Sequence, residues 1–88
     1  MTTSEDQNPE INQIQPIIQL LNEGATEKAL ELVENLINQF PNSALLFNIR
    51  GACCKTVNKL EKALESFQKA VKIKPDFSEA YYNLGVIE

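Results

Sequence analysis

The chain has 88 residues, 43% of them apolar and 23% charged, and 12 acidic side chains outweigh 8 basic ones to give a net charge of −4. These values are typical of one small domain with a hydrophobic core, and no apolar run is long enough to cross a membrane. Most lysines alternate with glutamates, and only Lys69, Lys72 and Lys74 form a short basic cluster, so we expect no nucleic acid partner. Residues 1–10 are polar and acidic, unlike a secretory signal.

The first predicted element is a helix whose apolar residues recur every three or four positions, at Ile14, Ile17, Ile18 and Leu21. We expect it to start near residues 13–15, because Pro16 is tolerated in the first turn of a helix and not in its interior. Gly24 is expected to end it, since glycine adopts the left-handed capping conformation without steric cost. Residues 1–9 are predicted to be a flexible segment.

Four more helices follow, separated by short turns. Pro41 and Pro75 close the second and fourth helices, because proline cannot donate the next backbone hydrogen bond, and the third helix turns into the fourth at Asn58. Asp76 and Glu79 have the spacing of a capping box before the fifth helix. The apolar positions are Ala29, Leu32, Val33, Leu36 and Phe40 in the second helix, Leu46, Phe47, Ile49, Cys53 and Cys54 in the third, Leu60, Ala63, Leu64, Phe67, Ala70 and Val71 in the fourth, and Ala80, Tyr81, Leu84 and Ile87 in the fifth.

The two cysteines, Cys53 and Cys54, are neighbours, and side chains of adjacent helical residues do not face each other. A metal site would need further ligands, and the chain has no histidine and no C-x-x-C motif. We therefore interpret the cysteines as small apolar residues of a helix in a reducing compartment, the cytoplasm, and expect no metal and no cofactor.

The sequence repeats itself with a period of 34 residues. Residues 27–31 (EKALE) recur unchanged as residues 61–65. Agreement at several positions with one offset is the signature of a repeat architecture. The further pairs at this offset are Val33 and Phe67, Ile37 and Val71, Pro41 and Pro75, Phe47 and Tyr81, and Gly51 and Gly85.

This period and these landmarks resemble the tetratricopeptide repeat family of helical hairpins. Two residues depart from the family's pattern, because Arg50 stands where leucine is usual and Cys54 where tyrosine is usual. The first copy resembles the family less, since Pro16 falls where leucine belongs. The resemblance covers about residues 10–88, and the matching residues of the second copy are Phe47, Gly51, Ala63, Phe67, Ala70 and Pro75.

The resemblance implies an all-α fold of about five helices, in which antiparallel hairpins stack as a right-handed solenoid. Residues 10–43 are then a degenerate first hairpin, residues 44–77 the second, and residues 78–88 the first helix of a truncated third repeat. Because that last helix would have no partner helix, we expect the chain to be part of a longer protein.

The function implied by the resemblance is non-catalytic binding of a peptide segment or protein surface in a concave groove lined by the first helix of each hairpin. The candidate groove residues are Ile14, Ile18, Asn48, Ala52, Lys55, Thr56, Glu79, Tyr82 and Asn83. The isoleucines of the first helix have two interpretations, as an apolar end of the groove or as part of the core.

Two alternatives accompany this interpretation. Chains of this family also precede enzymatic domains such as glycosyl- or sulfotransferases, where they would serve self-association or substrate recruitment, although nothing in this sequence resembles a catalytic site. A homodimer through the C-terminal helix is the other predicted association. One subclass is excluded, because co-chaperones that grip chaperone tails use basic groove residues. The matching positions here are Ile14, Ile18, Ile49, Glu79 and Asn83.

Overall fold

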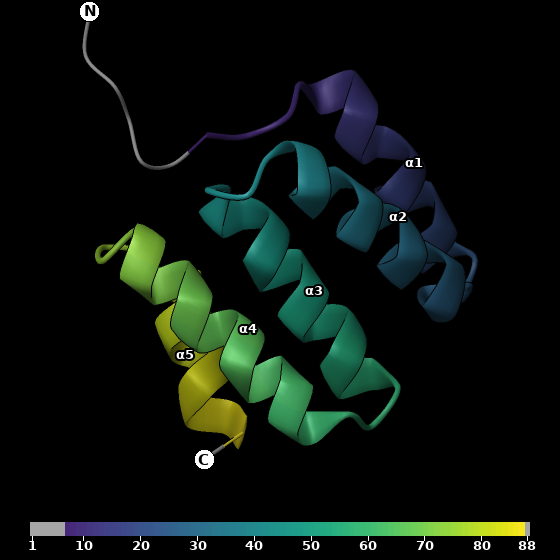
Figure 1. Cartoon of the computed structure of the whole chain (residues 1–88). Helices are drawn as coiled ribbons and strands as arrows, with labels where there is room; N and C mark the ends of the chain where they lie inside the picture. The colour runs from purple at the N-terminus through teal and green to yellow at the C-terminus, as the bar shows by residue number, and fades with distance from the viewer. Residues whose placement is uncertain (1–6, 88) are drawn as a thin grey trace, which may run out of the picture.

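The computed structural model describes residues 7–87, and side chains as far as residue 85 (Figure 1). The described part is all-α and contains no strand. Consecutive helices run antiparallel and pack in chain order, so that each hairpin lies against the next. The helices are α1 (Ile11–Asn22), α2 (Thr26–Gln39), α3 (Ala44–Thr56), α4 (Leu60–Ile73) and α5 (Ser78–Ile87).

The two hairpin turns have the same geometry 34 residues apart. Gly24 and Asn58 both take positive φ, at 80° and 66°. After each, the next residue's N–H reaches back to the helix, from Ala25 to Leu20 at 2.8 Å and from Lys59 to the carbonyl of Cys54 at 2.7 Å. This left-handed cap satisfies the last helical carbonyls, and glycine and asparagine are the residues that tolerate it. The predicted turns at Gly24 and Asn58 are confirmed.

The turn between α2 and α3 also holds the segment that precedes α1. Ser43 caps α3, because its Oγ accepts a hydrogen bond from the N–H of Leu46 at 3.2 Å. The same hydroxyl donates to Oδ1 of Asn8 at 2.6 Å, and the N–H of Gln7 donates to the carbonyl of Asn42 at 2.9 Å. Of the segment predicted to be flexible, residues 1–6 lie outside the described residues, whereas residues 7 and 8 are attached to this turn.

Helix α1 begins earlier than predicted. It starts at Ile11, and Pro16 therefore lies in its second turn instead of its first. The helix tolerates this proline because the ring is exposed and only one intrahelical hydrogen bond is lost. An additional bond supports the start, since the N–H of Glu10 donates to the side chain of Gln13 at 3.0 Å.

The main core lies between α1, α2, α3 and α4. Three predicted apolar positions of α2, α4 and α5 are exposed, Leu32 by 36%, Leu60 by 47% and Tyr81 by 50%. Leu30 is buried instead of Leu32, because the contact face of α2 is centred on Ala29 and Val33 and turns Leu32 to its edge. Leu60 is the first residue of α4 and lies beside the exposed turn. The buried residues of this core are Ile17, Ala29, Leu30, Val33, Leu36, Leu46, Cys53, Cys54, Ala63 and Phe67.

Helix α3 has a glycine where the Phe67 ring of α4 packs against its backbone. A Cβ atom on Gly51 would lie 2.5–2.7 Å from three carbons of the Phe67 ring, which is itself fully buried. Glycine is therefore required here for the two helices to pack at this distance. At Gly85, the matching residue of α5, a Cβ would meet nothing within 4 Å. The repeat match of Gly51 and Gly85 is therefore not accompanied by the same close packing among the described residues.

Candidate functional site

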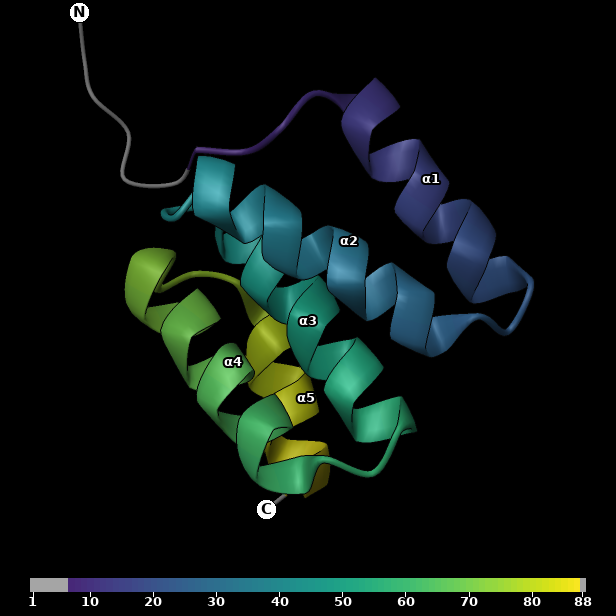
Figure 2. The same cartoon turned by 45° about the vertical axis from the view of Figure 1, so that its right-hand side comes forward.

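Three of the candidate groove residues form one hydrogen-bonded cluster between α3 and α5. The side-chain amide of Asn48 donates to Oε1 of Glu79 at 3.0 Å, and the amide of Asn83 donates to Oδ1 of Asn48 at 3.1 Å. Asn48 is buried, with 6% of its surface exposed. The Glu79 carboxylate therefore accepts its hydrogen bond from α3. It does not form the capping box that was predicted with Asp76. The cluster holds α5 beside α3 (Figure 2).

The remaining candidates of α3 and α5 are exposed around this cluster. Ala52 and Lys55 follow Asn48 by four and seven residues, which places the three on one face of the helix. Thr56 borders this face, and its hydroxyl donates to the carbonyl of Ala52 at 3.0 Å. Tyr82 projects from α5 with 71% of its surface exposed. The face thus has a polar centre with an aromatic ring and an ammonium group near it.

The two candidates of α1 have different positions. Ile14 is buried, with 5% of its surface exposed, whereas Ile18 is 45% exposed. Helix α1 packs against α2, so its inward residues cover the core of the first hairpin. The core interpretation therefore applies to Ile14, and Ile18 is the α1 candidate whose side chain is accessible.

The cysteines behave as core residues. Cys53 and Cys54 are both reduced and buried. Burial raises the pKa of the Cys53 thiol to about 11, with a smaller contribution from Cys54. Burial also raises the pKa of Cys54, against the opposing effect of nearby Arg50. Both thiols are therefore neutral near pH 7 and poor nucleophiles.

The described residues contain neither a metal-binding cluster nor a membrane-spanning helix. No group of three or more His, Cys, Asp or Glu side chains in residues 7–85 could hold a metal ion. Within the described part of the chain, every helix is too short and too polar to cross a membrane.

The lysine cluster is partly engaged with aromatic rings, since Lys69 lies 5.8 Å from the ring centre of Phe47 and Lys74 lies 5.4 Å from that of Phe77.

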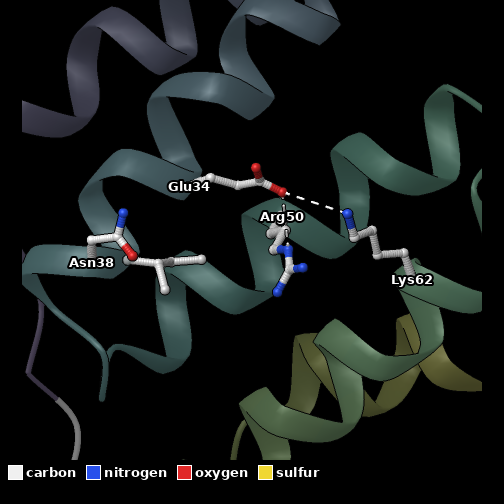
Figure 3. A pocket seen from close by; sticks show the side chains of 5 residues that line it. Glu34, Asn38, Arg50 and Lys62 are labelled. Carbon is white, nitrogen blue, oxygen red and sulfur yellow. Dashed lines mark ion pairs between the residues drawn. The ribbon is translucent and has the colours of Figure 1, made fainter.

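An ionic cluster on the other side of α3 was not predicted from the sequence. Arg50 lies between α2 and α4, where its Nε is 3.6 Å from Oε2 of Glu34. Nζ of Lys62 lies 4.0 Å from the same oxygen. Together with Ile37 and Asn38 these side chains line a pocket (Figure 3). The departure of Arg50 from the family pattern was the sequence signal for this site.

Residues 57–87, from the second hairpin turn through α5, match a family model described as TPR repeat. The chain belongs to the tetratricopeptide repeat family. Its helices form the antiparallel hairpins of a tetratricopeptide repeat solenoid, and such repeats generally mediate protein–protein interaction. The family also accounts for the shared 34-residue period of the turns at Gly24 and Asn58.

Several known proteins are similar to this tetratricopeptide chain. It is 33% identical over 60 residues to the peroxisomal targeting signal receptor of Saccharomyces cerevisiae, which is 68% of the chain and 10% of the receptor. It is 35% identical over 60 residues to the receptor of the same name from Candida albicans, with the same coverage. It is also 36% identical over 64 residues to the mouse protein O-mannosyl-transferase TMTC1, 68% of the chain and 7% of the transferase. The chain thus spans a tenth or less of these relatives, and no solved structure matches it significantly.

Proposed function

We propose that the chain is a non-catalytic module that binds a peptide segment or a protein surface along the concave face formed by α3 and α5. The cluster of Asn48, Glu79 and Asn83 carries this proposal, because it fixes two groove helices side by side and presents amide and carboxylate groups between them. The name of the yeast relatives, peroxisomal targeting signal receptor, describes recognition of a signal by a protein. The proposed partner of this chain is likewise a protein or a peptide segment.

The chemistry of this face suits an extended peptide. A peptide backbone offers N–H and C=O groups that need partners when water is displaced. Asn48, Glu79 and Asn83 each retain donor or acceptor capacity beyond the two bonds between them. The exposed ring of Tyr82 supplies apolar area at low entropic cost, and Lys55 supplies charge.

The proposed setting follows from the cysteines. Two buried reduced thiols without a disulfide partner are typical of a reducing compartment, so we place the chain in the cytoplasm. Neither nucleic acid nor membrane is a proposed partner, since the chain carries a net charge of −4.

Removing the groove side chains should weaken binding without unfolding the chain. Peptides are first selected from a displayed random library against the wild-type chain, and their affinities are then measured by calorimetry. We expect Y82A to lower affinity by about tenfold or more, since loss of an aromatic anchor costs at least about 1.4 kcal/mol. N48A should have a similar effect because it breaks the cluster.

The matched control is N35A, which makes the same change at an exposed position of α2. Circular dichroism of each variant reports whether helices are lost. Because N48A also removes bonds that hold α5, the Y82A result is decisive for the groove. Unchanged affinity of Y82A and N48A, with helices intact, would show that the selected peptides bind elsewhere.

A second candidate role is that of a leader in a larger enzyme. The observation that favours it is the similarity to TMTC1 and to the Pseudomonas putida protein described as probable biofilm formation methyltransferase WspC, with 30% identity over 71 residues. In that role the repeats would recruit substrate or self-associate, and the chemistry would belong to another domain. The full-length reading frame discriminates the two roles.

Self-association is proposed through α5. Tyr81 is half exposed, at 50%, and lies beside Gly85, where a neighbouring helix could approach. Exposed apolar area on this scale is relieved by a second copy of the same surface. Light scattering across a concentration series should show the mass rising toward that of a dimer.

The variant Y81S should return this species to a monomer, and L60S, which removes an exposed leucine from α4, should not. A strict monomer at high concentration would contradict the proposal, as would a dimer that persists unchanged in Y81S.

A further inference from the structure

The ionic cluster beside α3 has an unusual composition for a position between packed helices. The family pattern places leucine at residue 50, and this chain has arginine there. The Arg50 side chain is only 19% exposed, compared with 44% for Glu34 and 45% for Lys62. Figure 3 shows the Arg50 side chain between those of Glu34 and Lys62, among the residues that line the pocket.

The charges in this pocket do not balance. Arg50 and Lys62 both approach one oxygen, Oε2 of Glu34. The other lining residues, Ile37 and Asn38, are uncharged. The five lining side chains therefore include two cations and one anion, a surplus of one positive charge within the lining itself, although Lys62 also borders Glu61 and Glu65 outside this pocket.

The hydrogen bonds do not balance either. Nε of Arg50 is buried and has no hydrogen-bond partner, and it is the only such side-chain nitrogen or oxygen found within residues 7–85. Its distance of 3.6 Å to Glu34 is an ion-pair distance and too long for a hydrogen bond. A buried N–H without an acceptor costs free energy, and an acceptor that draws the guanidinium toward the opening of the pocket would recover it.

We propose that this pocket is a second binding site, which takes a side-chain carboxylate from an acidic segment of a partner protein. The planar guanidinium of Arg50 presents donors that match the two oxygens of a carboxylate. The ammonium group of Lys62 adds a second positive charge to the pocket. The amide of Asn38 can donate as well, and Ile37 packs the methylene stem of the ligand side chain.

The charge count favours a carboxylate over a phosphate. One carboxylate carries one negative charge, which neutralises the surplus of the pocket. A phosphate near pH 7 carries almost two, and its second charge would face Glu34 without compensation. The chemistry of the site therefore selects aspartate or glutamate side chains.

This site is separate from the concave face. Arg50 follows Asn48 by two residues, which is about 200° around the helix. The two side chains therefore lie on opposite faces of α3, and a partner could be held on both. Failure at one site is distinguishable from failure at the other, because the variants that test them do not overlap.

The direct test observes the Arg50 Nε–H by ¹⁵N-resolved NMR while a blocked peptide with three consecutive glutamates is added. We expect this resonance to shift and saturate, and the effect to weaken as sodium chloride is raised. Affinity, from backbone amide shifts around the pocket, should fall at least tenfold in R50L and several-fold in K62Q. The control K28Q changes the net charge equally at an exposed lysine outside the pocket.

The variant R50L should remain folded, because leucine is the family residue at this position and the remaining Glu34 is 44% exposed and still lies 4.0 Å from Lys62. If circular dichroism shows that R50L unfolds, K62Q carries the test, since Lys62 is largely exposed. Equal weakening by K28Q and K62Q would reduce the effect to overall charge and overturn the proposal. A shift of the Nε–H with inorganic phosphate but not with the peptide would overturn the choice of carboxylate, and unchanged binding in folded R50L would overturn the site.

Discussion

The substitution F67A should lower the free energy of unfolding by about 3–5 kcal/mol, the range for removing a buried phenylalanine. Phe67 is fully buried between α3 and α4 and contacts the main core. Alanine would lose the transfer energy of the ring and leave a cavity that the surrounding helices cannot fill. Because a domain of this size has only about 5 kcal/mol of stability, the variant should be largely unfolded.

Urea denaturation followed by circular dichroism at 222 nm gives this measurement. The matched control is F77A, which removes the same ring from a half-buried position near the start of α5. Its cost should be smaller, since Phe77 is only partly buried and loses less apolar contact than Phe67. Equal costs for the two variants would show that the core is not centred on Phe67.

The second large effect is expected at Gly51. In G51A the new Cβ would lie 2.5–2.7 Å from the Phe67 ring, which is fully buried. Overpacking of this kind costs about 1–3 kcal/mol. Each kcal/mol lowers the melting temperature by about 4–8 °C in a domain of 60–100 residues.

The chain provides its own reference for this measurement. G85A makes the same change in helix α5, where nothing lies within 4 Å of the new methyl group. Both variants gain the helix propensity of alanine, up to about 1 kcal/mol. The difference between their free energies of unfolding therefore isolates the clash at Phe67. That clash should be relieved in the double variant G51A/F67L, and a G51A variant as stable as G85A would refute the close approach.

The sequence predicted the hairpins well because the repeat constrains them twice. The turns at Gly24 and Asn58 are 34 residues apart and both need a residue that tolerates positive φ. Pro41 and Pro75 mark the ends of α2 and α4 in the same way. At these positions the backbone preferences of the residues and the 34-residue period predict the same turn, so the prediction rests on two independent signals.

Positions decided by packing were less predictable. The predicted start of α1 is too late because Pro16 favours a position in the first turn, whereas the structure places it at the sixth residue of the helix. Leu32 and Leu60 were expected in the core since an apolar pattern does not show which edge of a helix face is covered. The sequence does not decide whether Ile14 lines the groove or belongs to the core, because its burial depends on how α1 tilts against α2.

The candidate groove shows the same division. Sequence alignment proposed Asn48, Glu79 and Asn83 as separate groove residues, and they are bonded to one another. Their bonds depend on the distance between α3 and α5, which no pattern within one helix encodes. The ionic cluster of Arg50 was not predicted because its three side chains come from three different helices. Only the arginine at a position where the family has leucine indicated it.

The order of helix contacts has a consequence for how this chain folds and opens. Each described helix packs on its neighbour in sequence, and the one contact that skips a helix joins α3 and α5. Stability in such a stack is a sum of nearest-neighbour terms, so units can open one at a time from an end. A ligand bridging α3 and α5 would add a term to α5 without changing α1. Part of the ligand's binding free energy would then be used to order α5. The measured affinity of the ligand would therefore depend on the fraction of molecules in which α5 is packed against α3.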